Sequence, residues 1–109
     1  MEGEWVKKLF EGQIRAETVV RELGSNGMLL GHWLLVDAIT ERLAGRSAQE
    51  AVRCSAALHG ISPRLAYSRI RGVICCMAKV RSERYAELWD IKKPTPLELV
   101  EKITDGAGR

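Results

Sequence analysis

The stretch AALHGISPRLAYSRIR, residues 56–71, decides the fold of this chain. It has the pattern of one helix ending, a tight turn, and a second helix beginning. Ala56 supplies a small side chain where two helices cross, and four positions later Gly60 tolerates the positive φ of a tight turn. Ile61 is apolar and fills the gap between the helices, while the Ser-Pro pair after it caps and opens the next helix. The stretch therefore predicts a helix-turn-helix.

The second helix, expected over residues 63–80, has an apolar face and a polar face. The apolar residues recur at helical spacing and form a stripe that we expect in the core: Ala66, Ile70, Val73, Ile74 and Met77. The opposite face carries Arg64, Tyr67, Ser68, Arg71 and Gly72. Arginine pairs with guanine in the major groove of DNA, and serine and tyrosine contact bases or phosphates. The alternative is a basic corner on a helix pair that only packs.

The predicted DNA-binding residues belong to this helix and its cap: Ser62, Arg64, Tyr67, Ser68, Arg69, Arg71 and Lys79. Within this set we expect base contacts from Arg64, Tyr67, Ser68 and Arg71. Flanking basic residues are better suited to phosphates, namely Arg69, Lys79, Arg81 and Arg84. His59, in the turn, is a candidate for a phosphate or helix-end contact.

Charge is distributed unevenly along the chain. The net charge is +3, but residues 53–84 hold seven Lys or Arg and one Glu, so this segment is +6 and the remainder −3. Such asymmetry indicates one basic surface with an acidic partner, most commonly nucleic acid. A charged face in contact only with solvent is the alternative.

Helical spacing dominates the rest of the chain, so we predict an all-α fold, a compact bundle of about six helices containing the helix-turn-helix. The length of 109 residues indicates a single domain over 1–109, with 1–13 as an N-terminal extension and 105–109 as a flexible tail. The expected helices cover residues 4–11, 14–23, 28–44, 48–58, 63–80, 82–89 and 95–104.

The helix at 28–44 is expected at the centre of the core. Its apolar residues include Leu29, Leu30, Trp33, Leu34, Ile39 and Leu43, and His32 among them is expected to be packed. Ser47 with Glu50 three residues later predicts a capping box for the next helix. Thr95 with Glu98 has the same spacing at the start of the last helix.

Several classes of protein are disfavoured. The longest apolar run contains His32 and is shorter than a membrane span, and there is no recognisable signal peptide, so we expect a cytoplasmic protein without a membrane partner. The cysteines, Cys54, Cys75 and Cys76, lack zinc spacing, and we expect buried thiols in a reducing compartment. Without a nucleophile dyad or a glycine-rich phosphate loop, we expect no enzymatic activity, metal or cofactor.

Four motifs in order resemble a known family: VVRELG (19–24), GHWLLVDAI (31–39), SPRLAYSRIRGVI (62–74) and KKPTPLELVEKI (92–103). Together they look like the C-terminal DNA-binding effector domain of the master sporulation-initiation response regulator of endospore-forming bacteria. The resemblance covers residues 16–104. It implies a six-helix all-α domain with an internal helix-turn-helix that binds specific duplex sequences and controls transcription.

The resemblance also suggests roles for single residues. Arg71 matches a family arginine that contacts DNA, and Ile70 and Ile74 match the buried face of its recognition helix. Tyr67 and Ser68 replace an acidic residue and an arginine, so the family's target sequence is not expected to transfer. The segment before the helix-turn-helix is shorter than in the family, and 109 residues leave no room for the receiver domain that precedes this effector.

We therefore predict a stand-alone transcriptional regulator that binds double-stranded DNA. Palindromic or tandem sites require two copies, so a dimer is expected on DNA. The alternative is a protein-interaction module that pairs with a full-length response regulator and modulates its DNA binding. In that hypothesis the last helix, residues 95–104, is the contact, through Leu97, Leu99 and Val100.

Overall fold

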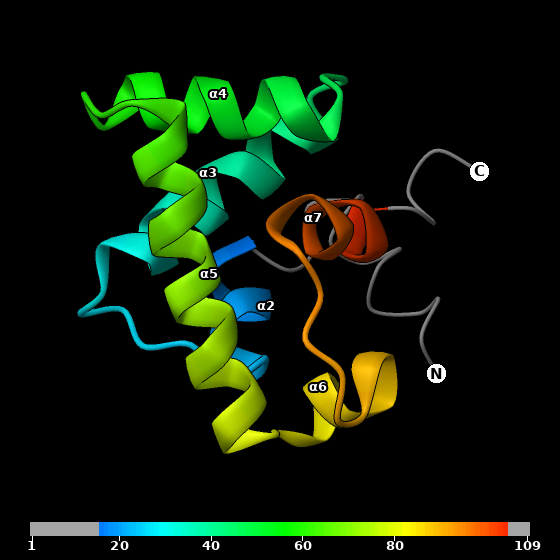
Figure 1. Ribbon diagram of the computed structural model, residues 1–109. Helices are drawn as coiled ribbons and strands as arrows, with labels where there is room; N and C mark the ends of the chain where they lie inside the picture. Colours follow the sequence, from blue (N-terminus) through cyan, green and yellow to red (C-terminus); the bar gives the residue numbers. More distant parts are fainter. Residues whose placement is uncertain (1–15, 105–109) are drawn as a thin grey trace.

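Six helices and no strand make up the part of the chain that the structure describes, residues 16–104 of a computed structural model (Figure 1). They are α2 (Ala16–Glu22), α3 (Leu30–Leu43), α4 (Ala48–Leu58), α5 (Pro63–Val80), α6 (Glu83–Trp89) and α7 (Pro96–Thr104). The all-α prediction is confirmed. The predicted helix at 4–11, the N-terminal extension and the tail lie outside the described residues. None of the described helices is both long enough and apolar enough for a membrane span.

Helix α3 lies at the centre and packs against α2, α4, α5 and α7. Figure 1 shows α4 across one end of α5, α6 at the other end, and α3 between them. The apolar stripe predicted for α5 is confirmed, since every member is at most 2% exposed. It shares one core with apolar residues of α2, α3 and α7, among them Val20, Leu35 and Leu99.

Three apolar side chains at the start of α3 do not join the core, which corrects the prediction for Leu29, Leu30 and Trp33. These side chains are 38%, 41% and 41% exposed. The reason is helical register, because Trp33 lies half a turn from Leu35, which is fully buried. The Trp33 indole N–H donates a hydrogen bond to the Gly27 carbonyl (2.7 Å), so the ring lies over the preceding turn.

Helices α3 and α5 meet at backbone distance where Gly31 crosses α5. A Cβ at Gly31 would lie 2.3 Å from the Arg69 carbonyl oxygen and 2.5 Å from a Val73 methyl group. Real carbon atoms do not approach so closely, so only glycine fits this crossing. The position of α5 against the core therefore depends on residue 31 being a glycine, which has no side chain.

His32 is fully buried, as expected, and its ring is satisfied on both sides. Its Nδ1 has a hydrogen bond with Ser25 Oγ (2.8 Å), and its Nε2 has one with Glu17 Oε1 (3.3 Å). Burial raises the pKa of Glu17, but hydrogen bonds from Arg21 and His32 outweigh burial and leave the pKa below 4.5. This network joins α2, α3 and the turn between them.

Side-chain caps fix where the helices begin. Ser47 Oγ accepts a hydrogen bond from the Glu50 N–H (3.2 Å), which confirms that Ser47 caps α4. At α7 the box is reciprocal: Thr95 Oγ1 accepts from the Glu98 N–H (3.2 Å), and Glu98 Oε1 accepts from the Thr95 N–H (3.0 Å). These hydrogen bonds favour the carboxylate and lower the pKa of Glu98.

The Gly31 crossing predicts that Gly31→Ala destabilises the protein. The new methyl group would meet backbone that cannot move aside, so we expect a loss of about 1–3 kcal/mol in the free energy of unfolding. Gly72→Ala is the matched control, because it lies in α5 with no atom within 4 Å of an added Cβ. Alanine there should be neutral or stabilising by up to about 1 kcal/mol. Urea unfolding measures both, and equal effects would contradict the close crossing.

The capping box predicts that Glu98 contributes stability that depends on pH. The folded pKa lies below the usual 4.5, so this contribution is present above pH 4.5 and is lost as pH falls through the folded value. Glutamine at position 98 keeps a hydrogen-bond acceptor but loses the negative charge. At neutral pH the free energy of unfolding should therefore be larger for the wild type than for Glu98→Gln. That difference should shrink below pH 4.5 in urea unfolding. Glu101→Gln, beyond the box, is the control, and a pH-independent difference for Glu98→Gln would refute the prediction.

Candidate nucleic-acid interface

The turn between α4 and α5 is held by backbone hydrogen bonds and a left-handed glycine. Gly60 has φ +68°, as its place in the sequence predicts. The Gly60 N–H donates to the Ala57 carbonyl (3.1 Å), and the Ile61 N–H donates to the Ala56 carbonyl (3.0 Å). These bonds satisfy carbonyls at the end of α4. The Ile61 side chain is half-buried against the core, and Ala56 is fully buried.

Two further contacts anchor this turn. His59 Nε2 lies 2.6 Å from Asp37 Oδ2 of α3, so the half-buried imidazole that we considered for a phosphate contact has a carboxylate partner within the protein. Ser62 Oγ accepts from the Leu65 N–H (3.2 Å), and Pro63 is the first residue of α5. The start of α5 is therefore fixed both to α3 and by its own cap.

The outward face of α5 is basic and lacks a carboxylate. The exposed residues opposite the apolar stripe define this face: Arg64, Ser68, Arg71, Gly72, Cys75 and Lys79. Residues 63–80 contain no Asp or Glu. Within the described chain, no ion pair involves Arg64, Arg71, Lys79 or the neighbouring Arg69. Four positive charges on one helix therefore have no partner among residues 16–104.

The predicted site residues do not all share this face. Arg64, Ser68 and Arg71 lie together in the N-terminal half, and Lys79 lies near the other end. Tyr67 and Arg69 flank the face on opposite sides, two residues apart in the helix. Tyr67 is half-buried against the core. Arg69 borders a groove of about 270 Å³ between α5 and the start of α3, lined also by Leu29, Leu30, Gly31, Ser68, Gly72, Val73 and Cys76.

Two other arginines that we expected to contact DNA phosphates form ion pairs with carboxylates of this protein. Arg81 pairs with Asp90 in the segment after α6. Arg84 Nε lies 3.3 Å from Glu22 of α2, and a second Arg84 nitrogen lies 4.0 Å from Glu87. Carboxylates therefore balance the charges of Arg81 and Arg84. Lys79 is the last residue of this basic segment without an ion-pair partner among residues 16–104.

The cysteines were expected to be buried, and this is wrong for all three. Cys54 is half-buried, Cys75 and Cys76 are exposed, and all are free thiols. Cys75 lies four residues after Arg71, so the same helical spacing that predicts the outward face also predicts its exposure. No group of three His, Cys, Asp or Glu side chains in residues 16–104 could hold a metal ion.

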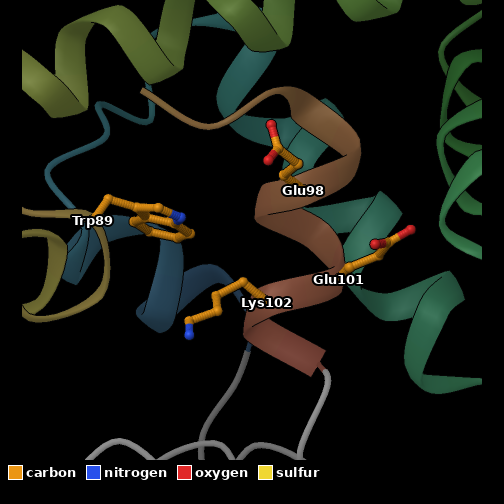
Figure 2. Close-up of a pocket in the computed structure, with 4 residues that line it drawn as sticks. All are labelled: Trp89, Glu98, Glu101 and Lys102. Carbon is orange, nitrogen blue, oxygen red and sulfur yellow. The ribbon is translucent and has the colours of Figure 1, made fainter. Parts of the chain in front are cut away.

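A pocket of about 320 Å³ borders α7 on its exposed side and is lined by Trp89, Glu98, Glu101 and Lys102. Figure 2 shows the Trp89 ring facing α7 from across this pocket. The apolar residues of α7 point the other way, since Leu99 and Val100 are fully buried and Leu97 packs against the core. Leu99 and Val100 are therefore unavailable to a partner, contrary to the contact expected in the interaction-module hypothesis, whereas Leu97 keeps part of its surface exposed.

The positive φ of Gly60 predicts which substitutions the turn tolerates. A β-branched side chain is strained in this conformation, so Gly60→Val should lower the free energy of unfolding by about 1–2 kcal/mol. Gly60→Asn is the matched control, because asparagine adopts the left-handed region more readily and should cost less. A Cβ added at Gly60 would meet nothing within 4 Å, so the difference reports mainly backbone strain. Equal losses in urea unfolding would contradict the assigned turn.

Comparison of the chain with protein-family models, with curated proteins and with solved structures finds no match. The resemblance to the sporulation effector domain therefore stands on its four motifs and stays a prediction. The exposure and charge of the α5 side chains are the observations from which a function can be inferred.

Proposed function

We propose that this chain binds double-stranded DNA through α5 and regulates transcription. The observation that carries the proposal is the set of four basic side chains on α5 without an ion-pair partner in residues 16–104. Duplex DNA supplies regularly spaced phosphates that such a set can neutralise, with release of counterions. Helix α4, the turn and α5 act as the helix-turn-helix, and α5 is the recognition helix.

The shape of α5 suits the major groove. An α-helix with its side chains is about 10–12 Å across, and the major groove is about 12 Å wide. Arg64, Ser68 and Arg71 project from the N-terminal half of this 18-residue helix, where recognition helices make their base contacts. In this proposal Arg71 pairs with a guanine, and Arg69 and Lys79 hold phosphates. Tyr67, half-buried beside the face, contributes mainly by positioning the helix.

The order of the four motifs supports a role in transcription, because the sporulation effector domain that they resemble controls promoters. Since Tyr67 and Ser68 differ from that family, we propose a different operator sequence. Two copies bind a palindromic or tandem site, as expected for helix-turn-helix proteins.

Arg71→Ala is predicted to weaken binding to the cognate duplex by about 1–3 kcal/mol. The duplex is first selected from a random pool, and affinity is then measured by fluorescence anisotropy over a range of salt concentrations. Arg46→Ala is the matched control, because Arg46 is also exposed, lies in the loop before α4 and pairs with Glu41 of α3 (2.8 Å). It should leave affinity unchanged.

Two results would overturn this proposal. If Arg71→Ala and Arg46→Ala bind the selected duplex equally well, Arg71 does not contact bases. If no sequence is enriched and all binding vanishes with salt, α5 is only a basic surface. The second result would favour the interaction-module hypothesis, with contact through the exposed polar side of α7 and the Trp89 pocket of Figure 2.

A further inference from the structure

The outward face of α5 alternates long cationic side chains with small residues. Its cations are Arg64, Arg71 and Lys79, and the residues between them on this face are all small: Ser68, Gly72 and Cys75. A Cβ added at Gly72 would meet nothing within 4 Å, so the space beside the middle of the face is open. Small residues let a helix backbone approach a ligand closely, and the arginines then project furthest from it.

Three residues of this face lie in one narrow sector of the helix. At 3.6 residues per turn, positions 64, 68 and 71 fall within about 60° of one another. They form a row along the helix axis, with an arginine at each end and a serine between them. Seven residues at a rise of 1.5 Å separate Arg64 from Arg71 by about 10 Å along the axis.

Contacts on the other side of α5 fix the direction of this row. A Cβ at Gly31 would lie 2.3 Å from the Arg69 carbonyl oxygen, so α5 cannot rotate about its axis without displacing α3. The Ser62 cap fixes the first turn, which carries Arg64. Neither Arg64 nor Arg71 forms an ion pair within residues 16–104. Both guanidinium groups are therefore available to a ligand on this face.

We propose that Arg64 and Arg71 each bind one guanine, so that each half-site, the DNA bound by one copy, holds two G·C pairs separated by one or two other base pairs. The inference rests on the duplex binding proposed for α5 and adds the sequence that the helix selects. Arginine donates two hydrogen bonds to N7 and O6 of guanine, a pair of acceptors that no other base presents in the major groove.

The distance between the arginines sets the spacing of the guanines. Successive base pairs rise about 3.4 Å along a duplex, so a row of about 10 Å spans about three steps when it is parallel to the duplex axis. An inclined helix spans fewer steps, and zinc-finger helices whose reading residues cover a similar length contact three successive bases. Two or three steps leave one or two base pairs between the guanines. The Ser68 hydroxyl both donates and accepts, so it discriminates little among these pairs.

Selection from a random duplex pool, followed by sequencing, is carried out with the wild type and three variants: Arg64→Ala, Arg71→Ala and Lys79→Ala. For the wild type we expect two G·C pairs at this spacing in each enriched half-site. Each arginine variant should lose the preference at one of these pairs, a different pair for each variant. Lys79→Ala is the control, because loss of a phosphate contact weakens binding to all sequences and leaves the enriched sequence unchanged.

A second measurement changes the DNA and leaves the protein intact. The base 7-deazaguanine lacks the N7 acceptor, and it replaces one guanine at a time in the selected duplex. In fluorescence anisotropy we expect wild-type affinity to fall about fivefold or more at each guanine. The variant without the arginine that binds the replaced guanine should show no further loss, which assigns one arginine to each guanine. Circular dichroism checks that the variants fold like the wild type.

The outcomes separate failure of this inference from failure of the proposed function. If the wild type enriches a sequence without two G·C pairs at this spacing, if Arg64→Ala enriches the same sequence as the wild type, or if 7-deazaguanine leaves affinity unchanged, recognition by two arginines is overturned while DNA binding stands. If the wild type enriches no sequence, the proposed function is overturned, and this inference falls with it.

Discussion

The backbone contact between Gly31 and α5 is the constraint on which the rest of the structure depends. Because no side chain separates the helices, the Arg69 carbonyl lies against α3 and the rotation of α5 about its own axis is fixed. That rotation turns the stripe from Ala66 to Met77 inward. The basic residues face outward as a consequence, so the exposure of the candidate interface follows from packing on its far side.

The N-terminal end of α5 is fixed independently. The Gly60 turn closes α4, Ser62 caps α5, and the contact between His59 and Asp37 ties the turn to α3. Arg64, Ser68 and Arg71 therefore project from a stretch of helix restrained at both the turn and the Gly31 crossing. A restrained helix loses little conformational entropy when it binds a rigid partner, which favours affinity.

Local signals account for what the sequence predicts correctly. Ser47, Gly60 and the Ser-Pro pair at 62–63 act within a few residues of themselves, so the bounds of α4 and α5 agree with the structure. Long-range contacts account for the errors. Trp33 and Leu35 lie on opposite sides of α3, and the packing of α3 against α2, α4, α5 and α7 decides which side is buried. Likewise, Arg81 pairs with Asp90 and Arg84 with Glu22, and these partners lie in other segments of the chain, so local spacing does not reveal them.

The separation of the two faces of α5 has an evolutionary consequence. Positions such as 64, 68 and 71 contribute little to the core, so they can diverge while the fold persists. Position 31, in contrast, leaves no space even for a methyl group. Substitutions at the outward positions can therefore change the charge and shape of this face while the packing of α5 against α3 stays the same.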